Sequence, residues 1–254
     1  MAGEGSRIET VIMRGRVAQS WPAAFLLLAV VVALLYAGSA SGDPGAGPVV
    51  AGFPAAGTLT IRAVRVRMRP DPHARTIRIM RQFRPDFRQQ EVFAVASRIG
   101  SDGQSWYRIS VPGRPNGRMG WVPFWSVDLR PTVAKVAVHR RSRRIDLFWH
   151  GKRVWHAIVA VGAPGMETPL GLYYAAARFV PHDDPYLSVF AVETSGYSKL
   201  TDWPGGGVFG IHGTPEPWLL GKAVSHGCVR VSARTALMLR RYVPLGTPIV
   251  ITDT

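Results

Sequence analysis

The stretch GIHGTPEPWLLGKAVSHGCVRV, residues 210–231, contains Cys228, which is the only cysteine in the 254-residue chain. Two histidines share the stretch: His212 lies sixteen residues before the cysteine and His226 lies two residues before it. A lone thiol cannot form an intramolecular disulfide, and outside the cytoplasm it is open to oxidation. We therefore expect Cys228 to be either buried and inert or a nucleophile that a histidine serves as base.

A cysteine nucleophile needs a base that takes its proton and N–H donors that hold the oxyanion. His226 and Cys228 would share a face in a strand but need not do so in a turn. His212 would reach the thiol if the intervening residues left one strand and returned beside it. A tight turn at Gly227, which tolerates unusual backbone angles, would aim the N–H groups of Gly227 and Cys228 at one oxygen.

Two other interpretations stay open at this level. His212, His226 and Cys228 would make three ligands, as in some catalytic zinc sites. Against this, the chain has no second cysteine and no HExxH pair. The alternative is a buried cysteine beside two incidental histidines, and the glycines interleaved with these three residues make it less attractive.

The same stretch closely resembles the signature of the L,D-transpeptidases, wall cross-linking enzymes with a YkuD-type catalytic domain. The matching residues are Ile211 to Thr214, Gly221, and Ser225 to Arg230. Thr168-Pro169-Leu170-Gly171 and the closing GTPIVI resemble two further segments of that family. The resemblance implies a catalytic domain over residues 132–252, built as a β-sandwich with one or two short helices.

The resemblance also implies catalytic roles. Cys228 would be the acylated nucleophile and His212 the general base, oriented by the backbone carbonyl of Gly213. His226 would assist, and the Gly227 and Cys228 N–H groups would hold the oxyanion.

For substrate binding, the resemblance gives Ser225, Thr214 and Arg230 a role in supporting the loop or contacting the donor peptide. Trp203 and Trp218 would border the peptide groove, although either could instead fill the core.

The implied reaction needs no metal and no organic cofactor. Cys228 would attack the bond between the third stem residue of peptidoglycan and the terminal D-Ala, and an amine of another stem peptide would resolve the thioester into a 3→3 cross-link. Water as acceptor would make an L,D-carboxypeptidase, a protein amine would make an anchoring enzyme, and a non-enzymatic wall-binding protein is a third alternative. The resemblance further implies that carbapenems acylate Cys228.

Upstream, residues 58–130 alternate apolar and basic side chains, as in TLTIRAVRVRMRP, and contain GSDGQ and PGRPNG turns. Period-two alternation with frequent turns predicts short half-buried strands and a small β-barrel. Trp106 to Ile109 and Gly117 to Val122 resemble the closing strands of bacterial Src-homology-3-like (SH3-like) domains. Such domains often bind wall peptides, but this one could equally be a spacer or pack on its neighbour.

Downstream of Pro131 the pattern is again mainly β. Gly151, in the sequence HGK, predicts a hairpin turn. SARTALMLRRYV predicts one helix, capped by Ser232, with Ala233, Ala236, Leu237 and the stem of Arg240 on its inner face. PHDDP, residues 181–185, is interpreted as a solvated turn.

The N-terminus predicts export. Residues 1–20 are basic and expected to be cytoplasmic, residues 21–37 are an apolar signal or signal-anchor helix, and residues 38–57 are a Gly/Pro/Ala linker. Cleavage near Ala40 and retention as a membrane anchor both fit this pattern. The protein would then lie in the cell envelope, where a net charge of +15 favours anionic wall polymers over nucleic acid.

Overall fold

The computed structural model describes residues 50–182, 184–202 and 204–254. The expected cytoplasmic segment, the expected signal or anchor helix and most of the expected linker lie outside these residues. Within them, no helix has both the length and the apolar character needed to cross a bilayer. The described residues belong to one compact unit, which contains two large β-sheets and a small two-stranded sheet.

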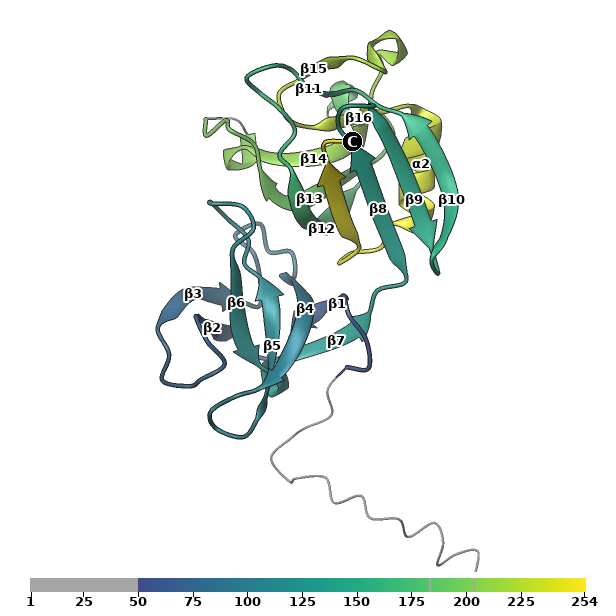
Figure 1. The fold of residues 1–254 in the computed structure, drawn as a ribbon. Coiled ribbons are helices and arrows are strands. Elements are labelled where there is room, and N and C mark those ends of the chain that lie inside the picture. The colour runs from purple at the N-terminus through teal and green to yellow at the C-terminus, as the bar shows by residue number, and fades with distance from the viewer. Residues whose placement is uncertain (1–49, 183, 203) are drawn as a thin grey trace, which may run out of the picture. The chain divides into compact units, whose positions relative to one another are not determined.

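The first sheet has seven strands in the order β3-β2-β6-β5-β4-β1-β7 (Figure 1). Its side chains enclose a core that includes Leu59, Val66, Ile109 and Val122, each almost fully buried. The strands are β1 (Ala55–Leu59), β2 (Ala63–Arg67), β3 (Thr76–Arg81), β4 (Glu91–Ile99), β5 (Ser105–Ser110), β6 (Met119–Pro123) and β7 (Val127–Pro131).

The start of this sheet differs from the prediction in two ways. β1 begins at Ala55, inside the segment interpreted as linker, and the one alternating strand is divided into β1 and β2. The division has a local cause, because Thr60 turns away from the ladder. Its N–H donates to the Ser126 carbonyl at 3.0 Å and its hydroxyl donates to the Trp125 carbonyl at 2.8 Å.

The second sheet has eight strands in the order β10-β9-β8-β17-β12-β13-β14-β16, and β11 pairs separately with β15 (Figure 1). The protein is thus mainly β, as predicted. The bounds are β8 (Ala134–His139), β9 (Arg144–Trp149), β10 (Lys152–Ile158), β11 (Val161–Gly162), β12 (Gly171–Phe179), β13 (Ala191–Tyr197), β14 (Val208–Gly213), β15 (Ala223–Ser225), β16 (Val229–Val231) and β17 (Pro248–Thr252). Short 3₁₀ turns lie at η1 (Phe124–Ser126), η2 (Pro185–Leu187), η3 (Pro204–Gly206) and η4 (Pro217–Leu219).

The predicted hairpin is confirmed. β9 and β10 pair antiparallel around His150 and Gly151, whose φ angles are 47° and 75°. Two consecutive positive φ angles are what a tight two-residue hairpin turn requires.

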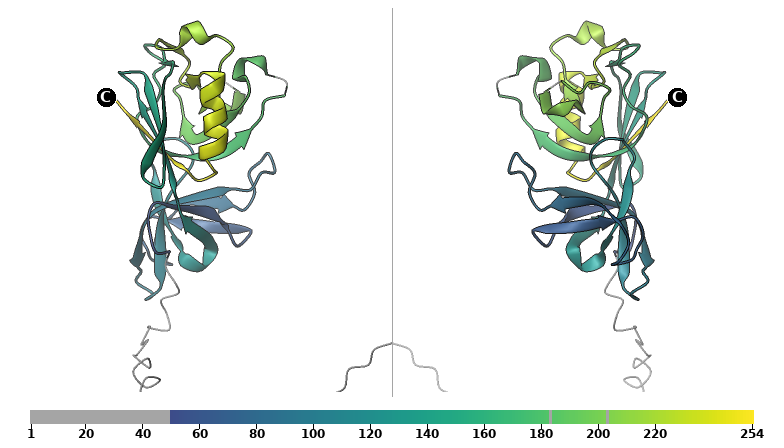
Figure 2. Two further views of the ribbon diagram at one scale, coloured as in Figure 1. Left: turned by 90° about the vertical axis from the view of Figure 1, so that its right-hand side faces the viewer. Right: turned by 90° about the vertical axis from the view of Figure 1, so that its left-hand side faces the viewer.

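The α-helix of the described residues, α2 (Ala233–Tyr242), is the predicted one, and Ser232 caps it by accepting a hydrogen bond from the Thr235 N–H. It contacts β9 and also β13 and β14, which are far from β9 in the strand order, so the sheet curls around it (Figure 2). Of the predicted inner face only Ala236 is buried; Ala233, Leu237 and Arg240 are exposed, so the prediction was wrong at these three positions. Thr235, Ala236 and Leu239 are the buried residues, because contact with both ends of the sheet sets the rotation of the helix.

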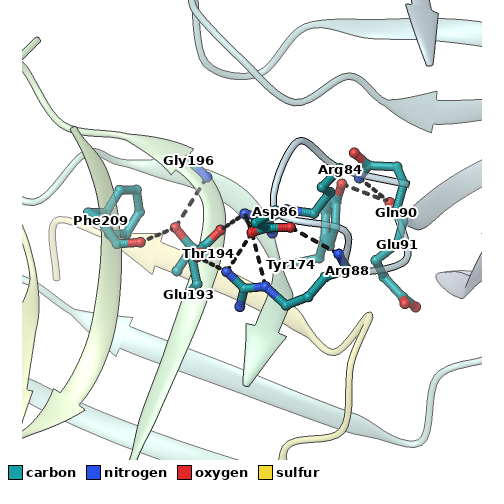
Figure 3. Close-up of polar contacts among 10 residues, drawn as sticks. All are labelled: Arg84, Asp86, Arg88, Gln90, Glu91, Tyr174, Glu193, Thr194, Gly196 and Phe209. Atoms are coloured by element: carbon teal, nitrogen blue, oxygen red, sulfur yellow. Dashed lines mark hydrogen bonds and ion pairs between the residues drawn. The ribbon is translucent and has the colours of Figure 1, made fainter. Parts of the chain in front are cut away.

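The two sheets share a contact with its own small core. The ring of Phe93 on β4 stacks on that of Tyr174 on β12 with 5.4 Å between centroids, and both side chains are fully buried. The Tyr174 hydroxyl donates to the Glu91 carbonyl at 3.1 Å, and beside this contact Arg84 forms an ion pair with Glu193 (Figure 3). Of the two alternatives for the first sheet, spacer or packed neighbour, the structure shows a packed neighbour.

Candidate active site

The pairing of β14 with β16 brings the segments that carry His212 and Cys228 side by side. These strands run parallel, with Ile211 opposite Val229 and His212 opposite Arg230. Neighbouring strands lie about 4.8 Å apart. Cys228, the residue just before β16, therefore comes to the side of Gly210, whose N–H points to the Cys228 Sγ at 3.4 Å.

His212, His226 and Cys228 line one cavity of about 320 Å³. Of the substrate-binding residues expected from the sequence, Ser225 and Arg230 also line it. The remaining lining residues are Asp184, Tyr186, Leu187, Ser198, Val208, Phe209 and Glu216.

The thiol of Cys228 is held mainly in its neutral form. Burial raises the pKa of Cys228, while the hydrogen bond from the Gly210 N–H and the positive charge of Arg230 act in the opposite direction. Both opposing groups favour the thiolate, so they stabilise the charge that appears when the proton leaves.

His212 is buried, with 7% of its surface exposed, and its Nδ1 lies 2.7 Å from the Gly213 carbonyl oxygen. A carbonyl oxygen only accepts, so Nδ1 carries the proton and Nε2 is the unprotonated nitrogen of the neutral ring. The pKa of His212 is lowered overall, mainly by burial and further by the charge of Arg230. The Gly213 carbonyl and Asp184 act in the opposite direction. The ring is thus a neutral base with a defined tautomer.

The turn before the cysteine is held by Ser225, which is fully buried. Its Oγ donates to the Cys228 carbonyl at 2.5 Å and accepts from the Gly227 N–H at 3.2 Å. Gly227 has a φ of 119°, and a Cβ there would lie 2.8 Å from the Cβ of Ser198. Only glycine combines this φ with so close a neighbour.

This hydrogen bond changes the oxyanion prediction. Gly227 was expected to aim its N–H at the substrate, but in the structure that N–H is bonded to Ser225. Gly227 shapes the turn, and the Cys228 N–H remains as the candidate donor from the motif.

Arg230 is a charged group that influences the pKa of both His212 and Cys228. Its guanidinium forms an ion pair with Glu216 at 3.3 Å, and it lowers the pKa of His212 and that of Cys228.

Two further predicted residues, Thr214 and Trp218, lie outside the cavity lining. Thr214 is buried outside the cavity lining, where its Oγ1 accepts from the Glu216 N–H at 3.1 Å and holds the local turn. Trp218, on η4, is 64% exposed and also lies outside the lining, so it neither borders the cavity nor fills the core. Trp203 lies outside the described residues. His226 is exposed and belongs to the lining.

Sequence reasoning missed several residues of the site. Asp184, interpreted as part of a solvated turn, lines the cavity and raises the pKa of His212. The sequence did not indicate Ser198 or Gly210. Ser198 contacts Gly227 and Gly210 contacts Cys228, and no local sequence pattern predicts these contacts.

A second cavity, of about 420 Å³, also reaches His212 and Cys228. Its lining includes Arg84, Asp86 and Arg88 from the loop between β3 and β4, together with Glu193 on β13. Figure 3 shows how these side chains pair. The first sheet thus contributes part of the wall around the thiol.

A metal site of three or more His, Cys, Asp or Glu side chains is not found among residues 50–182, 184–202 and 204–254. The three ligands considered for zinc therefore do not come together in ligand geometry in this part of the chain.

Residues 134–251 match the family model YkuD, the L,D-transpeptidase catalytic domain. A Bacillus licheniformis protein named as the L,D-transpeptidase YkuD is 30% identical over 118 residues, which are 46% of this chain and 65% of that protein. A Bacillus subtilis protein named as the L,D-transpeptidase YqjB is 28% identical over 145 residues, or 52% of this chain and 79% of that one. The chain thus spans just under two thirds of the first of these relatives.

Among solved structures, an L,D-transpeptidase from Mycobacterium tuberculosis H37Rv matches with a TM-score of 0.44 at 15% identity, over 79% of this chain and 99% of that one. The match to the family model, made by sequence, identifies residues 134–251 as a YkuD-type L,D-transpeptidase catalytic domain.

Proposed function

We propose that this protein is a peptidoglycan L,D-transpeptidase that forms 3→3 cross-links through a thioester on Cys228. The observation that carries the proposal is the parallel pairing of β14 with β16, which brings a buried neutral His212 and Cys228 to one cavity. The sequence match over residues 134–251 supports the reaction class.

In the acylation step, the Cys228 thiol gives its proton to the Nε2 of His212 as Sγ attacks the carbonyl carbon before the terminal D-Ala. The oxyanion accepts from the Cys228 N–H. The C–N bond then breaks, the D-Ala amine takes the proton back from His212, and the acyl group stays on Sγ as a thioester. The raised pKa of the thiol and the lowered pKa of the imidazole mean that the proton moves during attack, from a neutral pair.

In the second step, the side-chain amine of another stem peptide attacks the thioester. It loses a proton to His212, the C–S bond breaks, and the thiolate is reprotonated. The two cavities that reach His212 and Cys228 also share Leu187 and Phe209 in their linings, and together they would hold donor and acceptor at the same sulfur.

Product analysis with a disaccharide-tetrapeptide tests this function. A cross-linked dimer and released D-Ala support transfer, whereas a tripeptide alone supports an L,D-carboxypeptidase of the same fold. A lysine-bearing protein offered as acceptor tests the anchoring alternative. The Cys228→Ala variant should form none of these products, and products that persist in it would refute the nucleophile assignment.

For the rest of the chain we propose an N-terminal signal or signal-anchor over residues 21–37 and an SH3-like domain formed by the first sheet, over residues 55–131. The export proposal places the enzyme in the cell envelope, where its partners would be stem peptides, anionic wall polymers and the membrane. A groove of about 300 Å³ on the first sheet favours a binding role for this domain, because its lining includes Arg65 and Trp125, which is 53% exposed. Sacculus binding that survives Cys228→Ala but falls in Trp125→Ala would support this role, and equal binding by both variants would refute it.

A further inference from the structure

The loop between β5 and β6 reaches across to residues 197–200, which begin at the end of β13. The side-chain amide of Asn116, in this loop, makes two hydrogen bonds with the backbone of Tyr197. Its Nδ2 donates to the Tyr197 carbonyl at 2.8 Å, and its Oδ1 accepts from the Tyr197 N–H at 3.0 Å. This reciprocal pair fixes the position of the Tyr197 backbone as a strand partner would.

Arg114, two residues earlier, holds three more backbone groups. Its Nη2 donates to the carbonyls of Ser198 at 2.9 Å and Leu200 at 2.6 Å, and its Nη1 donates to the Gly206 carbonyl at 2.8 Å. The guanidinium also lies over the Tyr197 ring, 4.8 Å from its centroid. A planar group with five donors suits several fixed carbonyls in a way that an ammonium group does not.

The residues held in this way form part of the catalytic cavity. Ser198 lines the cavity and packs against the turn that precedes the nucleophile, since its Cβ lies 2.8 Å from where a Cβ on Gly227 would be. The Ser198 N–H donates to the Gly207 carbonyl at 2.8 Å, immediately before β14 begins. Contacts therefore run from Arg114 through Ser198 to the turn that carries Cys228.

We propose that Arg114 and Asn116 are positioning residues for catalysis, and that the first sheet is a working part of the active site because it supplies them. The proposal deepens the proposed function and rests on it for its catalytic part. Both residues lie outside the segment 134–251 that matches the family model. They act through Ser198 and Gly227, which set where Sγ stands relative to His212 and the Cys228 N–H.

The size of the effect follows from the geometry. Charge-assisted hydrogen bonds are stronger than neutral ones, and a small displacement of a reacting group slows a reaction steeply. We expect Arg114→Ala to slow acylation of Cys228 about tenfold or more. Asn116→Ala should slow it less, and Arg114→Lys should recover part of the rate, since an ammonium group still reaches one or two of the three carbonyls.

The experiment uses the full chain with two readouts. Hydrogen–deuterium exchange of the peptide that covers residues 197–200 reports the position of the loop and does not depend on activity. Mass spectrometry of carbapenem acylation at Cys228, recorded as a function of time and pH, reports the chemistry. We expect faster exchange and slower acylation in Arg114→Ala and Asn116→Ala, with the acid limb of the pH profile unmoved, because His212 and Arg230 keep their surroundings.

Two controls separate positioning from a general loss of structure. Arg108→Ala removes an exposed arginine of β5 and should change neither readout. Tyr174→Phe removes the hydroxyl bonded to Glu91 between the sheets; it should lower the melting temperature and leave the exchange of residues 197–200 and the acylation rate as they are.

Unchanged exchange in both Arg114→Ala and Asn116→Ala would overturn the proposal. Acylation slowed equally by Tyr174→Phe would also overturn it, because any loosening of the contact between the sheets would then suffice. A wild-type protein that no carbapenem acylates and that forms no cross-link would refute the proposed function. Faster exchange in the two variants would still support the positioning of residues 197–200 by Arg114 and Asn116.

Discussion

His212 on β14 and Arg230 on β16 lie directly opposite each other in a parallel pair of strands. This register brings the segment that contains His212 next to the segment that contains Cys228 and Arg230. Between them the chain leaves the sheet, passes through η4 and β15, and returns. Cys228 arrives at the start of the returning strand, beside the strand that carries the histidine. Backbone pairing thus fixes the proposed base beside the proposed nucleophile.

Replacing His212 tests its role as base. His212→Ala removes the only imidazole buried in the cavity, and loss of a general base costs about 10²–10⁴ in rate. We expect acylation of Cys228 to slow by that factor, as measured by intact-protein mass spectrometry over time. His156→Ala, which removes an exposed histidine of β10, should leave the rate unchanged. A His212→Ala enzyme within threefold of wild type would exclude His212 as the base.

The pH dependence follows from the direction of the His212 shift. Its folded pKa lies below the ordinary value of about 6.5, so the ring is neutral and competent at pH 6.5. The acid limb of the acylation rate should therefore have its midpoint below 6.5. The unfolded chain binds a proton near pH 6.5 that the folded protein does not, so His212 also lowers the free energy of unfolding as the pH falls below that value.

Replacing Arg230 should shift the pKa of His212 and the pKa of Cys228 in the same direction. Its charge lowers the pKa of His212 and that of Cys228, so Arg230→Gln should raise both. The acid limb of acylation and the pH profile of iodoacetamide alkylation at Cys228 should shift to higher pH together. Arg234→Gln, an exposed change on α2, serves as the control and should shift neither. A shift of the two profiles in opposite directions would contradict the common electrostatic cause.

Ser225 should matter for stability as well as rate. Ser225→Ala removes two hydrogen bonds that hold the turn before Cys228 and leaves the buried Gly227 N–H without its acceptor. Such a change costs about 1–3 kcal/mol. Urea unfolding should show this loss, and acylation should slow. Ser142→Ala breaks an exposed hydrogen bond to Thr254 and should cost much less; equal losses in the two variants would remove the special role of Ser225.

Glu91 gives a pH-dependent stability that is independent of catalysis. Burial on β4 raises its pKa to about 7, and only 6% of its surface is exposed. The uncharged carboxyl is favoured in the folded protein, so its contribution is fully present below the unfolded pKa of about 4.3 and is lost as the pH rises through about 7. Glu91→Gln should raise the free energy of unfolding by about 1–3 kcal/mol at pH 8 and change it little at pH 4.

Urea titrations at the two pH values, with the exposed Asp128→Asn as control, check the Glu91 prediction. A Glu91→Gln protein that is less stable than wild type at pH 8 would show that the charged carboxylate has a partner that stabilises it.

The sequence was most informative where structure is set locally. Alternating side chains indicated strands, the HGK turn at Gly151 indicated the β9–β10 hairpin, and Ser232 marked the start of α2. It was less informative where distant segments decide. Which face of α2 is buried depends on both ends of a curled sheet, and the break between β1 and β2 depends on Thr60 bonding to residues some 65 positions away.

The site shows the same division. The motif named Cys228, His212 and Ser225, because their chemistry and spacing are visible in one stretch. It misassigned the Gly227 N–H, since nothing in the sequence shows that the Ser225 hydroxyl takes it. Arg114 is more than eighty residues from the carbonyls that it holds, so only the folded chain could connect it with the cavity.

The most direct test of the nucleophile is intact-protein mass spectrometry of the full chain after incubation with a carbapenem, followed by peptide mapping. We predict a mass increase of one carbapenem on the wild-type protein, located on the peptide that contains Cys228, and no increase on Cys228→Ala. A wild-type protein that gains no mass, or an adduct that persists in Cys228→Ala, would contradict the assignment of Cys228 as the acylated nucleophile.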